Sequence, residues 1–143
     1  MNPDQNKIRN YLIRGLVITF ILGISAVVSG QELTIDSSYV QAREWASVGK
    51  YDNTRKICNY ILDSIPEHYD AKVLLALTYS WEKNYDTART MLQEIVMEEP
   101  GYWDALNSLT DIGIWSSNYD TALYFSKQGL KYHPKEMTIL LKK

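Results

Sequence analysis

Hydrophobic positions between residues 69 and 100 form two amphipathic stretches separated by a short polar break at Lys83 and Asn84. The first stretch has apolar residues at helical spacing: Ala71, Leu74, Leu75, Leu77 and Tyr79. The second stretch forms one stripe: Ala88, Met91, Leu92, Ile95 and Val96. This spacing places apolar side chains on one face of an α-helix. The pattern predicts two helices joined by a tight turn, the second capped by Asp86 and stopped at Pro100.

The same alternation of apolar stripe and polar break occurs before and after this segment. Before it, Gly49 marks the turn and precedes a second stripe: Ile57, Cys58, Ile61 and Leu62. After it, Asp120 is the expected cap. The stripe that follows consists of Ala122, Leu123, Phe125 and Leu130. The pattern therefore predicts a series of helix pairs along the chain.

Prolines and tyrosines recur along the series with a period of 34 residues. The prolines are Pro66, Pro100 and Pro134, and the tyrosines, each followed by Asp, are Tyr51, Tyr85 and Tyr119. Such a period is typical of stacked helical hairpins. It divides the chain into units 35–68, 69–102 and 103–136. The second and third units are identical at ten positions.

This pattern resembles the tetratricopeptide repeat family, whose helices cross at small residues and whose turns carry an aromatic residue. The residues at the matching crossing positions are Ala42, Ala76 and Thr110 on first helices and Thr54, Ala88 and Ala122 on second helices. The resemblance implies an all-α fold, a right-handed superhelical stack of helical hairpins. Gly113 and Gly129 stand where the family usually has an aromatic residue and Ala. We therefore expect looser packing in the third unit.

Residues 1–30 have the pattern of a secretory signal peptide. Basic residues precede an apolar run of 13 residues, Leu16 to Val28, and small residues follow it. The run is shorter than the roughly 20 residues needed to cross a bilayer. We expect cleavage before Gln31, with an uncleaved anchor as the alternative, and no membrane span after cleavage. At the other end, 137–143 is expected to form a cap helix or the start of a fourth unit, or the sequence is the front part of a longer protein.

Charge and composition argue against several classes of function. The formal net charge of the chain is −2, and removing residues 1–30 leaves 12 basic and 16 acidic residues, a net charge of −4. A chain of this charge with no basic block is a poor nucleic-acid binder. The sequence has no motif for a catalytic site, a metal or a cofactor. Cys58 is expected to be buried, and His68 and His133 to be exposed loop residues.

The first helices should line the concave wall of such a stack. The positions left over from packing are the candidate binding residues: Tyr39, Arg43, Asp70, Val73, Leu74, Leu77, Trp81, Asp104, Asn107, Ser108, Asp111 and Trp115. Trp81 and Trp115 share a register, so they should lie on adjacent rungs, roughly 10 Å apart. They could clasp an apolar peptide side chain or stack on sugar rings. The alternative is that both fill gaps between hairpins.

Some tetratricopeptide domains have a basic clamp for a terminal carboxylate. The matching positions here are acidic (Asp36, Asp70 and Asp104), which favours a neutral or basic partner. A narrower resemblance rests on the Trp before each turn and on the run 104–107. These features are similar to the periplasmic repeats that precede YaiO-type outer-membrane β-barrels.

Two functions follow from these resemblances. The first is an exported, non-catalytic scaffold for protein–protein interaction in the bacterial cell envelope, either in the periplasm or at the outer-membrane periphery. The alternative is the periplasmic part of an outer-membrane barrel or exopolysaccharide-export system. Such a part would contact a polysaccharide, with the barrel in the same chain or a neighbouring one.

Overall fold

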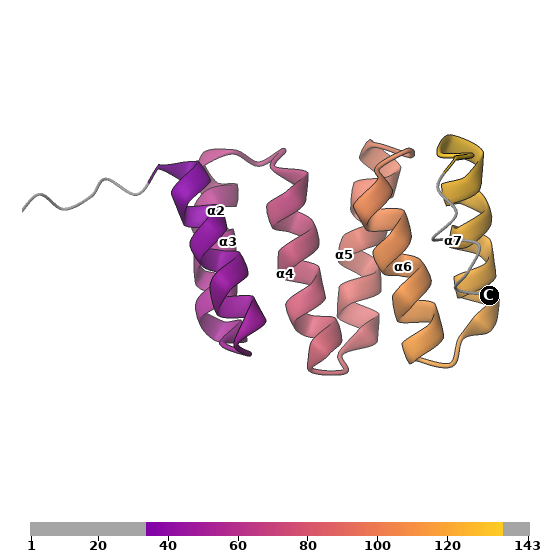
Figure 1. Cartoon of the computed structure of the whole chain (residues 1–143), viewed down its shortest axis with the longest axis horizontal. Coiled ribbons are helices and arrows are strands. Elements are labelled where there is room, and N and C mark those ends of the chain that lie inside the picture. The colour runs from indigo at the N-terminus through magenta and orange to yellow at the C-terminus, as the bar shows by residue number, and fades with distance from the viewer. Residues whose placement is uncertain (1–33, 136–143) are drawn as a thin grey trace, which may run out of the picture. The chain divides into compact units, whose positions relative to one another are not determined.

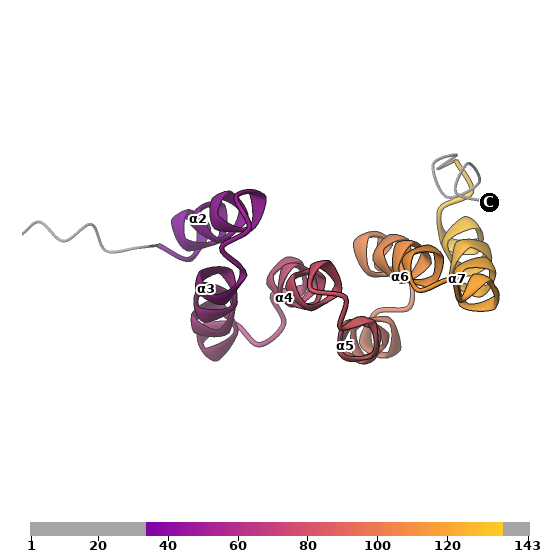
Figure 2. The same cartoon turned by 90° about the horizontal axis from the view of Figure 1, so that it is seen from below.

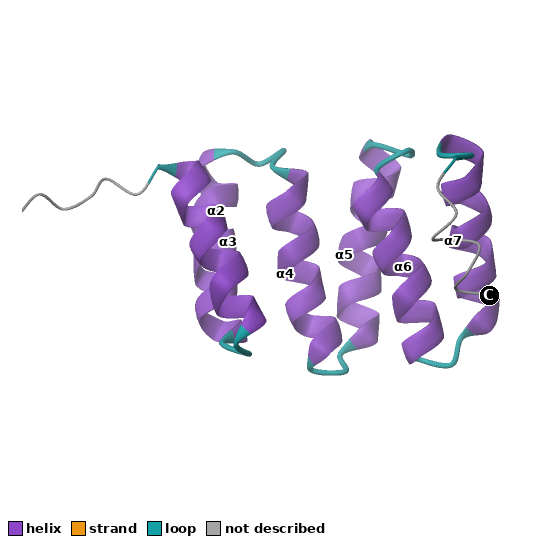
Figure 3. Cartoon of the chain, in the orientation of Figure 1, coloured by secondary structure: helices purple, strands orange, loops and turns teal. Residues whose placement is uncertain are grey.

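A computed structural model describes residues 34–135 of the chain, and these residues form six α-helices and no strand (Figures 1 and 3). The helices are α2 (Ile35–Ser47), α3 (Tyr51–Ser64), α4 (Tyr69–Trp81), α5 (Tyr85–Glu98), α6 (Trp103–Trp115) and α7 (Tyr119–Tyr132). The signal peptide predicted for 1–30 and the helix expected within 137–143 lie outside the described residues. None of the six helices combines the length and apolarity needed to cross a membrane.

The helices pack as consecutive antiparallel pairs, which follow one another along the stack (Figure 2). Within the pairs α2 packs on α3, α4 on α5 and α6 on α7. The pairs are joined where α3 contacts α4 and α5 contacts α6, and the first helices also touch, α2 with α4 and α4 with α6. The predicted all-α stack of helical hairpins is therefore confirmed.

The turn inside each pair has the same backbone geometry. Its central residue has a positive φ of 74° at Gly49, 65° at Lys83 and 57° at Ser117, three positions separated by the repeat period. Around Lys83 the backbone N–H of Lys83 donates to the Ser80 carbonyl and that of Asn84 to the Tyr79 carbonyl. These two bonds close the end of the first helix as a Schellman motif. The turn therefore recurs even where its centre is not glycine.

The predicted caps Asp86 and Asp120 are wrong by two residues. The side chain of Asn84 accepts a hydrogen bond from the backbone N–H of Thr87, and that of Asn118 accepts one from Thr121. Both helices begin at the tyrosine that follows the asparagine, so the aspartates lie inside the first turn. There a carboxylate faces the positive end of the helix dipole.

The expectation of looser packing in the third unit is also wrong. A Cβ atom built on Gly113 would lie 2.6 Å from the backbone N of Ala122 and 2.8 Å from its Cα. Real Cβ atoms do not approach backbone this closely. Without a side chain at 113, α6 and α7 come into direct backbone contact.

The small residues at the crossing positions are buried, as expected for close helix packing. In the first unit the single hydroxyl proton of Thr54 is shared between the carbonyls of Ala42 and Lys50, so this buried polar group is satisfied. In contrast, Leu123 and Tyr119 on α7 are 41% and 67% exposed. They face the side of α7 on which no further described helix packs.

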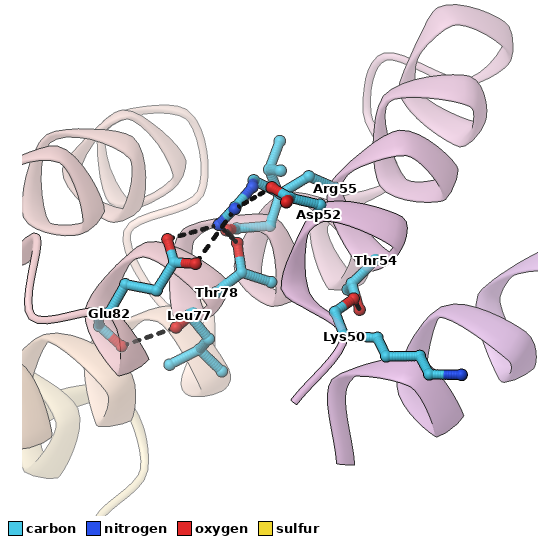
Figure 4. A network of polar contacts seen from close by, with 9 residues as sticks. Lys50, Asp52, Thr54, Arg55, Leu77, Thr78 and Glu82 are labelled. Atoms are coloured by element: carbon cyan, nitrogen blue, oxygen red, sulfur yellow. Dashed lines mark hydrogen bonds and ion pairs between the residues drawn. The ribbon is translucent and has the colours of Figure 1, made fainter. Parts of the chain in front are cut away.

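A polar network joins the first pair to the second (Figure 4). Arg55 on α3 donates to both carboxylate oxygens of Glu82, at 2.9 and 3.2 Å, and it also binds Asp52. Its guanidinium lies 5.0 Å from the centre of the Tyr79 ring. A guanidinium held by two carboxylates and a ring fixes the position of α3 against the end of α4.

Candidate ligand-binding groove on the first helices

One groove of about 500 Å³ opens between α2, α4 and α6. The structure brings together in it all twelve residues that the sequence placed on the concave wall. These are Tyr39, Arg43, Asp70, Val73, Leu74, Leu77, Trp81, Asp104, Asn107, Ser108, Asp111 and Trp115. Asp36, which the sequence analysis grouped with Asp70 and Asp104, is exposed but does not line the groove. That these residues bind a ligand stays a prediction.

The acidic end of the groove is built at the N-termini of α4 and α6. Asp70 and Asp104 are the second residues of these helices, and both are exposed. The hydroxyl of Tyr102 donates a hydrogen bond to the carboxylate of Asp70. Burial, with the nearby Asp70, raises the pKa of both Tyr102 and Tyr39, so these two phenols stay protonated.

The aromatic end lies at the opposite ends of the same helices. Trp81 and Trp115 are the last residues of α4 and α6, and they are 39% and 47% exposed. The Trp81 ring also packs on the ring of Tyr51, with centroids 5.5 Å apart. Trp81 thus supports the contact between the first two hairpins and also lines the groove.

The middle of the groove is mostly apolar. Val73 and Leu74 are buried and form its floor, and Leu77 is half-buried. Arg43 on α2 and Asp111 on α6 occupy equivalent positions of their units and lie on opposite walls. The groove therefore has charged walls, an apolar floor and one acidic and one aromatic end.

The two histidines have structural roles and are half-buried, contrary to the expectation of exposed loops. His68 caps α4 by accepting a hydrogen bond from the Ala71 backbone N–H, and its ring packs on Tyr39. The Nε2 of His133 donates to the Gly101 carbonyl over 2.6 Å, and the His133 ring meets Trp103 edge-on. Both rings hold the junctions between units.

The remaining chemically reactive groups of residues 34–135 are the Cys58 thiol and the side chains that could bind a metal. Cys58 is buried, as predicted, and burial raises the pKa of its thiol to about 12. A thiol with that pKa is a poor nucleophile at neutral pH. Within residues 34–135 no group of His, Cys, Asp and Glu could hold a metal ion.

Sequence reasoning missed the contribution of Tyr102 to the acidic end. This residue precedes α6 and is separated by 32 positions from Asp70, the carboxylate that it binds. It occupies the N-cap position of α6, and His68 occupies that of α4. An aromatic ring at the same junction of two units was the available signal, but a pattern in the chain does not show which group a hydroxyl reaches.

Comparisons with known proteins agree with this architecture. The tetratricopeptide repeat family model matches residues 46–109, a segment that includes parts of all three units. Over these residues the chain matches the tetratricopeptide repeat family. No curated protein matches this chain.

Solved structures of similar fold are distant in sequence. A tetratricopeptide repeat protein from Parabacteroides merdae superposes with a TM-score of 0.67 at 18% identity, over 90% of this chain and 50% of the other. The present chain thus spans about half the length of that protein. MamA from Desulfovibrio magneticus RS-1 gives a TM-score of 0.61 at 16% identity, over 94% and 76% of the two chains. At these identities the likeness concerns the fold.

Proposed function

We propose that this protein is an exported, non-catalytic scaffold that binds a segment of a partner protein in the groove between α2, α4 and α6. The observation that carries the proposal is the groove itself, with two half-exposed Trp side chains at one end. Trp is among the residues most enriched at binding hot spots, and a large exposed ring gains most from being covered. The family fold is in general that of a protein-binding scaffold.

Export is the second part of the proposal and rests on the pattern of residues 1–30. If the chain is exported with cleavage, N-terminal sequencing of the protein from the periplasmic fraction will begin at Gln31. A periplasmic protein that begins at Met1 would contradict cleavage. Recovery of the whole protein from the cytoplasm would contradict export.

The binding part can be tested without knowing the partner. A random library of twelve-residue peptides displayed on phage is selected against residues 31–143 and, in parallel, against the variant Trp81→Ala/Trp115→Ala. We expect the unmodified protein to enrich peptides that the variant does not retain. Trp45→Ala is the matched control, because Trp45 is on α2 but does not line the groove. Far-ultraviolet circular dichroism checks that each variant keeps its helices.

A second candidate is contact with a polysaccharide, favoured by the same pair of half-exposed Trp rings, which can stack on sugars. Oligosaccharides from bacterial exopolysaccharides are titrated while Trp fluorescence is recorded. Quenching that is lost in Trp81→Ala/Trp115→Ala would support the glycan function. If peptides are enriched and no oligosaccharide quenches, the protein-binding function stands. If neither binds, both are wrong.

A further inference from the structure

The two ends of the groove differ in chemistry, and the difference runs along the helices. On α4 the acidic residue is Asp70 and the aromatic residue is Trp81, at opposite ends of one 13-residue helix. Asp104 and Trp115 have the same placement on α6. With a rise of 1.5 Å per residue, the two ends are about 16 Å apart. A ligand that touches both ends therefore lies along the helices.

The acidic end favours a cation. Asp70 and Asp104 come from neighbouring helices, α4 and α6, and both border the groove. Tyr102 occupies one acceptor position of the Asp70 carboxylate, which has about four. Tyr39 and Tyr102 stay neutral and can add hydrogen bonds without adding charge. A Lys or Arg side chain would find two carboxylates here.

Arg43 is the one basic residue among those that line the groove, and it does not neutralise it. The lining side chains include three carboxylates, Asp70, Asp104 and Asp111, against this single guanidinium. Arg43 also follows Tyr39 by four residues, about one turn of α2, and therefore lies nearer the aromatic end than Tyr39 does. Carboxylates thus outnumber the single guanidinium in the groove, and an acidic tail of a partner would be disfavoured there.

The aromatic end favours an uncharged, flat side chain. Trp81 and Trp115 contribute no charge, and the floor that leads to them is formed by Leu77 and Leu74. Aromatic rings pair with one another in offset or edge-on geometry and gain stability beyond the area they bury. Since an extended peptide advances about 3.3 Å per residue, 16 Å corresponds to about five residues.

We propose that the groove selects an extended peptide segment with a Lys or Arg side chain about five residues from an aromatic side chain. The cation binds between Asp70 and Asp104, and the aromatic side chain packs between Trp81 and Trp115. This inference rests on the proposed protein-binding function and specifies the chemistry of its partner.

The peptides enriched in the phage selection test the inference first. We expect them to share a basic and an aromatic residue at this spacing. A synthetic peptide with one Lys and one Phe about five positions apart in a Gly-Ser background is then measured by isothermal titration calorimetry. Replacing Lys by Glu in the peptide should weaken binding by about tenfold, since one charged hydrogen-bonded contact is lost. Placing Lys and Phe next to each other should weaken it similarly.

Variants of the protein test which end of the groove binds the Lys side chain and which end binds the Phe side chain. Asp70→Asn/Asp104→Asn should weaken binding of the Lys peptide about tenfold. The same variant should not weaken binding of the Glu peptide. Asp63→Asn on α3 is the control for removal of a carboxylate away from the groove. Trp81→Ala/Trp115→Ala should abolish the preference for Phe over Ala in the peptide.

The outcomes separate this inference from the proposed function. If peptides are enriched without a basic residue, or if the Glu peptide binds as well as the Lys peptide, the inference is wrong and the protein-binding function stands. If Asp70→Asn/Asp104→Asn binds both peptides as the unmodified protein does, the cation does not bind where we place it and the inference is wrong. If no peptide is enriched, the protein-binding function fails, and the inference with it.

Discussion

At position 113 the chain carries glycine, and the equivalent residues of the first two units are Trp45 and Tyr79. The glycine lies against the backbone of Ala122, where even a methyl group would not fit. A bulky residue at this position keeps the two helices of a hairpin apart, whereas its absence lets them touch. A change that looks like a loss of packing in the sequence is thus a gain of backbone contact in the structure.

Gly113→Ala tests this contact. In an ordinary helix interior, Gly→Ala stabilises by about 1 kcal/mol. Here the added Cβ would collide with backbone atoms, which move only with their helix, so we expect the free energy of unfolding to fall by roughly 2 kcal/mol. Urea unfolding measures it. Gly113→Ala/Ala122→Gly removes the Ala122 Cβ at 2.8 Å but leaves its backbone N at 2.6 Å and its Cα at 2.8 Å, so it should recover only part of the loss. An unchanged or raised stability of Gly113→Ala would contradict the close contact.

At the scale of elements, the three turns have one geometry but different residues at the centre. A left-handed conformation costs a non-glycine residue about 1 kcal/mol or more. Gly49 avoids that cost, and Lys83 and Ser117 do not. The helices on either side impose the turn, because both Schellman hydrogen bonds form in each case.

Lys83→Gly should therefore stabilise the protein by about 0.5–1 kcal/mol and raise the melting temperature by a few degrees. Gly49→Ala should lower it, and no atom lies within 4 Å of the added Cβ, so the effect would come from backbone strain alone. Differential scanning calorimetry of the two variants provides the comparison. A melting temperature that falls in Lys83→Gly would show that glycine gains nothing at this turn.

The polar contact between the first and second helix pairs recurs only in part between the second and third helix pairs. Arg89 is the equivalent of Arg55 and binds Asp86 at 2.9 Å, but Ser116 stands where Glu82 would be. The Nε of Arg89 is buried without a hydrogen-bond partner in the described part of the chain. The second junction therefore lacks the carboxylate that holds the guanidinium at the first.

Ser116→Glu should supply that carboxylate and stabilise the protein by about 0.5–1 kcal/mol. A double-mutant cycle with Arg89→Ala isolates the pair from other effects of the substitution. Ser116→Gln is the control of similar size without charge. Chemical denaturation at low and high salt is the measurement, and a coupling energy near zero at low salt would show that the two side chains do not meet.

At the scale of the molecule, the main contacts of each described helix pair are with its neighbours in the stack, so stability is distributed along the stack. α4 is packed by α2, α3, α5 and α6, and seven of its residues are buried. α2 has three buried residues. The interior of the stack is therefore expected to open less often than its first helix.

Native-state amide hydrogen exchange measures this gradient directly. We expect the amides in the middle of α4 and α6 to be protected more strongly than those of α2, since an end helix can open without disturbing the others. Uniform protection across α2, α4 and α6 would instead mean that the stack unfolds as one cooperative unit.

The sequence by itself determined the repeat, the helix pairs and the residues of the groove wall. A period of 34 places equivalent residues on the same face of successive first helices, so residues as distant as Tyr39 and Trp115 could be assigned to one surface. The period carries this information because it specifies the face of the helix on which each side chain lies. That face depends only on the geometry of the single helix.

Only the tertiary structure decided the features that depend on distances between helices. It brought the Tyr102 hydroxyl to the Asp70 carboxylate and the His133 ring to the Gly101 carbonyl, and it placed α6 in backbone contact with α7 at Gly113. A hydrogen bond or a backbone contact forms or fails within a few tenths of an ångström. The distance between two helices is set jointly by all the side chains packed between them. No local pattern along the chain specifies that distance.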